Sequence, residues 1–322
     1  KYLFGLVLLM ILPLFSLSQN SAEQYLVAAD EQEGEEKIET LEKAVQLAEK
    51  ESFDEVARKG YVQLIKMYES EDKVAQELKT RIQFLNYLST KTDDKKGEAE
   101  SEYGIGKLYL NQRIYEKAAE RFRSARILAQ EIGDKELFFN SLKNYAWAYH
   151  QKGISQLMDG AAGENSVISS PIRSSFRNAR NAYEQLLDIA EQAGKSKEQL
   201  WIRQQLARVT HEEGKYEEER LHHAAALRLA RRQKNADATV KALNNLGYVS
   251  KFLGKDEEAL SYFEQAHTEV ALSYGKSGRQ KAQMESDILL NKGVLLHNLG
   301  KSFDAIETLE ESARKASQAG DL

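Results

Sequence analysis

Internal repetition constrains the fold of this chain more than any other feature of its sequence. A small residue recurs at equivalent places, and the intervals between successive members are 40, 61, 40 and 46 residues. These small residues are Gly106, Ala146, Ala207, Gly247 and Gly293. Self-similarity at a period of about 20–50 residues is typical of solenoids and related repeat architectures. The sequence therefore predicts a stack of similar units, in which the interval of 61 residues is one unit plus an insertion.

Each unit has the pattern of two amphipathic helices joined by a turn. Apolar residues recur at helical spacing from Ser21 onward. In one unit Gly247 is followed by Ala259, Phe263 and Ala266, and we expect Gly247 to face Ala259 across the helix pair. Four units also carry a glycine seven residues after the small residue, namely Gly153, Gly214, Gly254 and Gly300. Glycine readily supplies the left-handed residue at a helix C-terminus, so these four glycines are predicted to end first helices.

The small residue, the turn glycine and the later Ala, aromatic residue and Ala resemble the tetratricopeptide repeat, most closely between Leu243 and Ala266. The resemblance implies an all-α, right-handed α-solenoid of stacked antiparallel helix pairs with about seven repeats. We expect two degenerate repeats over residues 19–95 and five repeats over residues 96–322. In this family the first helices line a concave groove, which implies a protein or an extended peptide as the partner.

One segment breaks the repeat pattern. Residues 155–174 contain two glycines around a pair of alanines, followed by Ser169, Ser170 and Pro171. We predict a loop inserted here between the two helices of the fourth unit. Long loops are either functional or disordered, and both interpretations stay open for this segment.

The N-terminus has the features of a secretory signal. Lys1 precedes an apolar run over residues 2–15, and small residues follow it. We predict a signal peptide over residues 1–18, cleavage between Ser18 and Gln19, and an exported protein that is periplasmic or extracellular. A membrane span usually needs about 20 apolar residues. This run is shorter and contains Pro13, which favours a cleaved signal peptide. A retained membrane anchor is the alternative.

Composition and motifs exclude several classes of function. The formal net charge is −5, which disfavours a nucleic-acid partner, and the absence of cysteine excludes disulfides, thiol catalysis and cysteine-bound zinc. The sequence contains no phosphate-binding loop and no nucleophile elbow. The adjacent His222 and His223 would point about 100° apart on a helix, which does not suit a shared metal. We therefore expect no enzyme, no cofactor and no metal site, with membrane contact only through the N-terminal segment or a later span.

Two columns of polar residues on the first helices form the candidate peptide-binding site. Two residues before the small residue stand the amides Asn144, Gln205, Asn245 and Asn291. An amide both donates and accepts hydrogen bonds, so such a column can grip a peptide backbone, or it can instead bridge adjacent helices. Four residues after the small residue stand His150, His211, Lys251 and His297. This second column predicts a cationic track for an acidic ligand that strengthens at low pH, unless these are merely half-exposed groove residues.

The repeat pattern and the predicted signal together indicate an exported, non-catalytic module that binds proteins or peptides. Such an array resembles the ligand-sensing or scaffold region of bacterial signalling proteins. The alternatives are a free-standing periplasmic assembly scaffold, and the non-catalytic part of a larger enzyme, such as a histidine kinase, that continues after residue 322.

Overall fold

A computed structural model describes residues 21–160, 169–271 and 277–320, and the regular structure of these residues is entirely helical. The predicted signal peptide over residues 1–18 and its cleavage site lie outside them. Residues 21–30 are helical, and the helices that follow are α2 (Gly34–Glu51), α3 (Asp54–Ser70), α4 (Val74–Lys91), α5 (Lys95–Asn111), α6 (Tyr115–Glu131), α7 (Lys135–Gly160), α8 (Ser170–Gln192), α9 (Ser196–Glu212), α10 (Tyr216–Arg232), α11 (Ala236–Phe252), α12 (Asp256–Ala271), α13 (Gly278–Asn298) and α14 (Ser302–Ala319). In this described part of the chain, no helix is long and apolar enough to cross a bilayer.

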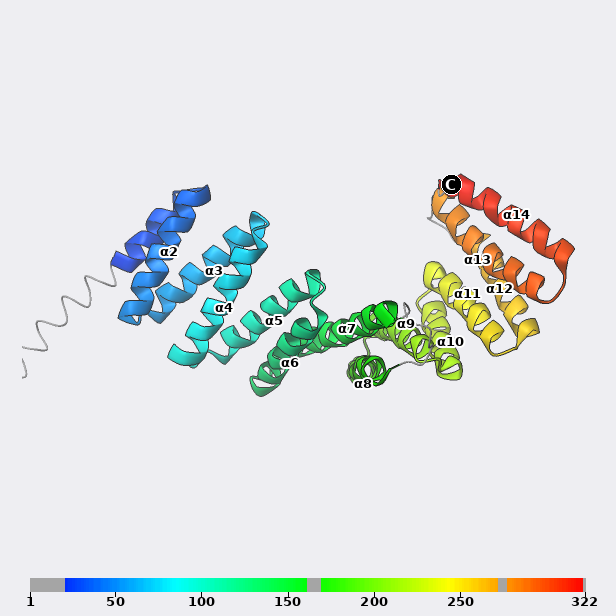
Figure 1. Cartoon of the computed structure of the whole chain (residues 1–322), viewed down its shortest axis with the longest axis horizontal. Helices are drawn as coiled ribbons and strands as arrows, with labels where there is room; N and C mark the ends of the chain where they lie inside the picture. The colour runs from blue at the N-terminus through cyan, green and yellow to red at the C-terminus, as the bar shows by residue number, and fades with distance from the viewer. Residues whose placement is uncertain (1–20, 161–168, 272–276, 321–322) are drawn as a thin grey trace, which may run out of the picture. The chain divides into compact units, whose positions relative to one another are not determined.

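The chain divides into two compact units, Lys1–Ala148 and Tyr149–Leu322. Inside each unit, helices that follow one another in sequence pack side by side and run in alternating directions, as α5 with α6 and α13 with α14 show (Figure 1). Two helix pairs precede α5, and further pairs begin at α5, α7, α9, α11 and α13. The chain is therefore an all-α solenoid of about seven repeats, as the sequence predicted.

Local sequence signals explain where these helices begin and end. The Asn235 side chain accepts a hydrogen bond from the Ala238 backbone N–H at 3.0 Å and so caps the start of α11. The predicted turn glycines Gly214, Gly254 and Gly300 follow α9, α11 and α13 with φ angles of 72°, 68° and 74°. Glycine adopts this left-handed conformation without steric cost, and the chain turns into the second helix of each pair there.

Close helix approach, and not only turn formation, explains the other glycines of the pattern. A Cβ atom on Gly247 would lie 2.5 Å from Cε1 of Phe263, so the nearest neighbour of this glycine is the aromatic ring and not the predicted Ala259. The same arrangement occurs between Gly106 and Phe122 in the first unit. The glycines Gly106, Gly247 and Gly293 therefore make room for a bulky side chain of the second helix, Phe122, Phe263 and Leu309 respectively.

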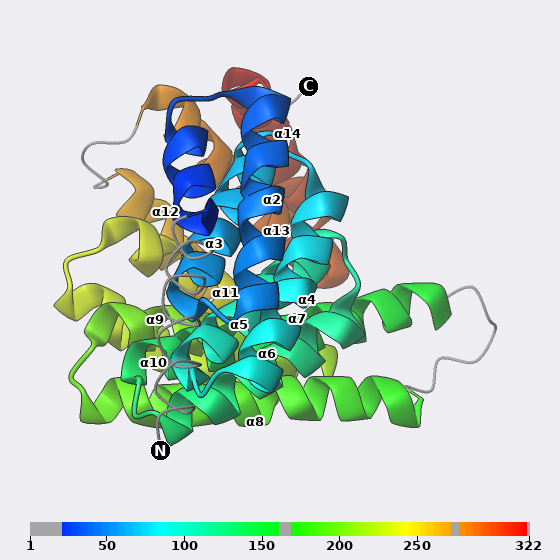
Figure 2. The same cartoon turned by 90° about the vertical axis from the view of Figure 1, so that its left-hand side faces the viewer.

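Gly153 and the predicted insertion at 155–174 differ from the expectation. Gly153 does not end a helix but lies inside α7, where its Cβ would be 2.6 Å from Cε1 of the fully buried Phe176. Residues 155–160 continue α7, and residues 170–174 begin α8. Figure 2 shows these two long green helices both reaching toward the right-hand side of the view. Much of the predicted loop is thus an extension of both helices, to 26 and 23 residues, compared with 17 in α9 and α10.

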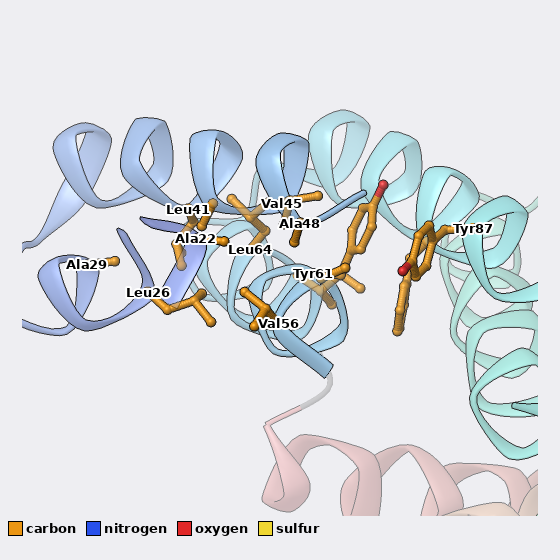
Figure 3. Close-up of a cluster of buried hydrophobic side chains, with 14 of the residues drawn as sticks. Ala22, Leu26, Ala29, Leu41, Val45, Ala48, Val56, Tyr61, Leu64 and Tyr87 are labelled. Atoms are coloured by element: carbon orange, nitrogen blue, oxygen red, sulfur yellow. The ribbon is translucent and has the colours of Figure 1, made fainter. Parts of the chain in front are cut away.

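One continuous apolar cluster of the first unit is formed by residues 21–30 together with α2, α3 and α4. Leu26, Leu41, Val45 and Leu64 meet between residues 21–30, α2 and α3 (Figure 3). Tyrosines close the edges of this core by burying the ring and directing the hydroxyl to a carboxylate, as expected for buried tyrosine. These hydroxyl-to-carboxylate pairs are Tyr61 with Glu49, Tyr68 with Glu42, and Tyr87 with Asp54.

Candidate functional site

A cleft of about 660 Å³ lies on the second unit, along the first helices α9, α11 and α13. Its walls are mostly polar and include aromatic, amide and charged side chains. The residues that line it are Lys197, Leu200, Trp201, Gln204, Arg208, His223, Gln233, Asn235, Asp237, Ala238, Lys241, Asn244, Asn245 and Asp287.

Helical spacing explains why these side chains share one surface. Trp201, Gln204 and Arg208 follow one another at intervals of three and four residues, which places them on one face of α9. Lys241 and Asn244 stand at the corresponding positions of α11. Relative to the small residue of each repeat, this face carries the residues six and three places before it and one place after it. The sequence reasoning selected other positions and so missed Trp201, Gln204 and Arg208.

The four amides of the first predicted column do not lie together on this surface. Asn144 Nδ2 donates to Tyr103 Oη at 2.9 Å, and Asn291 Nδ2 donates to Asn244 Oδ1 at 3.1 Å. Both bonds join one first helix to the preceding first helix, which is the bridging alternative that the sequence left open. Gln205 is only 5% exposed within α9. Asn245 alone is exposed on the cleft wall.

His150 belongs to the core and not to a cationic track. It is 2% exposed, and its ring centroid lies 6.2 Å from that of Phe176 and 6.4 Å from that of Tyr183. Burial, together with the nearby Arg208 guanidinium, lowers the pKa of His150 to about 4. Its imidazole is therefore neutral near pH 7 and offers no charge to a ligand.

Two other members of the second column, His211 and Lys251, contact the same pair of rings. The ring centroid of His211 lies 5.9 Å from that of Tyr248 and 5.7 Å from that of Phe252, and Lys251 Nζ lies 5.4 Å from the Phe252 centroid. His211 Nδ1 lies 2.9 Å from Glu219 Oε2, and this hydrogen bond raises the pKa of the imidazole. Lys251 Nζ lies 4.9 Å from the ring centroid of Tyr248, within cation–π range. His297 is exposed near the end of α13. The structure therefore brings His211 and Lys251 together beside Tyr248 and Phe252, whereas the buried His150 interrupts the predicted cationic track.

Arg208 and Lys197 supply the available positive charge of the cleft. Both are exposed, and in the part of the chain that the structure describes neither has a carboxylate within ion-pair distance. By contrast, Lys241 Nζ pairs with Asp237 Oδ2 at 3.2 Å. Asp287 Oδ1 accepts a hydrogen bond from Gln283 Nε2 at 3.2 Å. The α9 side of the cleft is therefore the side that favours an anionic group.

Trp201 gives this end of the cleft a fixed aromatic wall. Its ring packs against Tyr183 with an edge-on geometry and a centroid separation of 5.9 Å. The arrangement of indole, amide and guanidinium is suited to recognition by hydrogen bonds and contact. Over the described residues, no group of three His, Cys, Asp or Glu side chains is placed to hold a metal ion.

Several solved structures share this architecture. BtubC (BKLC) from P. vanneervenii is 16% identical, with a TM-score of 0.54 over 78% of this chain and 91% of that one. A putative kinesin light chain from Podosopora anserina with nearly identical TPR-like repeats is 14% identical, with a TM-score of 0.50 over 67% of this chain and 96% of that one. The fold is TPR-like.

The apo form of RapI shares the same TPR-like fold at 12% identity, with a TM-score of 0.50 over 81% of this chain and 98% of that one. At such identities the likeness concerns the fold alone. No protein-family model matches the sequence, and no curated protein matches it.

Proposed function

We propose that this chain is a non-catalytic module that binds a protein or an extended peptide, and that the cleft along α9, α11 and α13 is its binding surface. The observation that carries the proposal is the set of amides on the cleft wall, Gln204, Asn244 and Asn245, beside Trp201 and Arg208. An amide side chain donates and accepts, so it pairs with a peptide backbone whatever the ligand sequence is.

The spacing of a TPR-like stack suits such a ligand. Neighbouring helices lie about 10 Å apart, whereas an extended peptide advances about 3.3 Å per residue. A peptide crossing the first helices would therefore meet a new helix at about every third residue. Gln204 stands on α9, and Asn244 and Asn245 stand on the next first helix, α11. A peptide that crosses both helices would therefore meet an amide at each of them, and these amides would hold its backbone.

A peptide-library selection against the purified chain tests this function. We expect the double variant Gln204→Ala, Asn245→Ala to fold like the parent and to bind a selected peptide at least about tenfold more weakly, since each lost hydrogen bond costs about 1–3 kcal/mol when its partner stays unpaired. Gln265→Ala removes an exposed amide of α12 outside the cleft and serves as the matched control. If the double variant bound the peptide as tightly as the parent, the cleft would not be the binding surface.

We further propose that the module is exported and serves as the ligand-sensing or scaffold region of a bacterial signalling protein. The support is the basic, apolar and small-residue order of residues 1–18. N-terminal sequencing of the protein recovered from a bacterial host should return Gln19 first. Recovery of the uncleaved apolar segment would instead favour a retained anchor.

A further inference from the structure

We propose, building on the peptide-binding function above, that the cleft is polarised and selects a partner segment with an acidic residue and an apolar residue about six positions apart. The acidic residue would lie at α9 and the apolar residue at α13. The proposal rests on the different side chains that three successive first helices present on one continuous face.

The α9 end provides the site for the acid. Arg208 is exposed, and its planar guanidinium offers a pair of parallel N–H donors that match a carboxylate. No carboxylate in the described chain occupies it. Lys197 adds a second unpaired cation to the same wall of the cleft.

The middle of the cleft offers hydrogen bonds and little net charge. Asn244 lines the cleft and its Oδ1 accepts from Asn291, so its amide N–H groups are the donors it can offer a ligand, and Asn245 beside it is exposed. The one cation of this helix on the cleft, Lys241, is neutralised by Asp237. A peptide backbone fits this stretch better than a charged side chain does.

The α13 end combines one acidic side chain with an exposed apolar pair. Asp287 lines the cleft, and Leu290 and Val294 follow it at intervals of three and four residues, on the same face of α13. These two side chains are 50% and 37% exposed, although leucine and valine favour burial. The Asn291–Asn244 bond holds α13 against α11 at this level, so the exposed aliphatic pair borders the amide stretch.

The charges also set the direction of the ligand. A segment lying in the reverse sense would place its acid near Asp287 and its apolar side chain near Arg208. Like charges side by side disfavour that pose, so the cleft combines an attractive contact with a repulsive one. Two helix spacings of about 10 Å, divided by about 3.3 Å per residue, give the separation of about six residues between the two ligand groups.

Synthetic nonapeptides in a Gly/Ser/Ala background test the proposal directly. One peptide carries Asp and Leu six positions apart, and the comparison peptides carry the pair in reverse order, the pair three positions apart, or Asn in place of Asp. We expect the parent chain to bind the first peptide at least about tenfold more tightly than each of the others, as for other directional charge and contact recognition.

Two single variants separate the ends of the cleft. Arg208→Gln should abolish the preference for Asp over Asn and keep the preference for Leu, and Leu290→Ser should do the reverse. Circular dichroism melting of both variants checks that the fold is intact. Peptides that bind without any preference for charge, order or spacing would overturn the polarised cleft and leave the peptide-binding function standing. If the selection and all nonapeptides yield no binding, the peptide-binding function itself fails.

Discussion

The contact between Gly247 and Phe263 gives the sharpest test of how the repeats pack. A Cβ on residue 247 would lie 2.5, 2.7 and 2.9 Å from three atoms of the Phe263 ring, well inside the usual carbon–carbon separation of about 3.5–4.0 Å. Phe263 is fully buried, and protein interiors are close-packed, so its ring must displace neighbouring side chains to turn away. The substitution Gly247→Ala must therefore part α11 and α12 or strain the ring.

Two effects of opposite sign decide the magnitude. Alanine is a better helix former than glycine by about 1 kcal/mol, which by itself would stabilise α11. Overpacking a full core typically costs about 1–3 kcal/mol. Because the clash involves three ring atoms, we expect the cost to win and Gly247→Ala to lower the free energy of unfolding by about 1–2 kcal/mol.

Urea denaturation followed by circular dichroism measures this loss. Gly278→Ala is the matched control, because this glycine is also helical and a Cβ there meets no atom within 4 Å. The control should be as stable as the parent or more stable by about 0.4–1 kcal/mol. Adding Phe263→Leu to Gly247→Ala should cost less than the sum of the two single changes, as expected for residues in contact. A Gly247→Ala variant as stable as the parent would refute the packing described for this repeat.

Two further predictions follow from buried polar contacts. His150 takes up a proton near its ordinary pKa of 6.5 in the unfolded chain but only at a pKa of about 4 in the folded chain. The neutral imidazole therefore contributes its full stabilisation above pH 6.5. The free energy of unfolding should fall by at most about 3 kcal/mol as the pH drops from 6.5 to 4. His150→Phe should flatten that part of the stability curve in urea titrations at several pH values, and an unchanged curve would contradict the assignment. Asn291→Ala should lower the free energy of unfolding by about 1 kcal/mol because Asn244 loses its partner, whereas Asn245→Ala should change it by less than about 0.5 kcal/mol. Equal effects of the two asparagine variants in thermal melting would count against the bridging role.

The repeat architecture was readable from sequence because small residues recur wherever a bulky side chain of the second helix needs room, as at Gly247 and Phe263. Gly153 was misread for a simple reason. It stands as far from Ala146 as Gly214 does from Ala207, and spacing alone does not distinguish a glycine that turns the chain from one that admits a ring. The distinguishing partner, Phe176, lies beyond the predicted loop and becomes visible only when both helices are seen to extend.

The site was harder to predict because periodicity reveals that a helix is amphipathic but not which part of its polar face borders a cleft. That choice depends on how α9, α11 and α13 are arranged around the cleft. At the position two places before the small residue, Asn144 and Asn291 bond to the preceding first helix, whereas Asn245 lines the cleft. The prediction that His150 lies in the groove was wrong for another reason. The helix α7 continues beyond His150, and the Phe176 ring of α8 packs against its imidazole.

The extension of α7 and α8 has a consequence for how this solenoid can change length. Gly153 lies seven residues after Ala146, and its partner Phe176 lies seven residues before Tyr183. Seven residues make almost two full helical turns, so the added segments return to the core with nearly the same phase. An insertion of five residues in each helix would rotate the new stretch by about 140° and turn Phe176 toward solvent. A helix pair can therefore lengthen away from the stack and keep its buried face only in steps close to a whole number of turns, such as seven or eleven residues, added to both helices together.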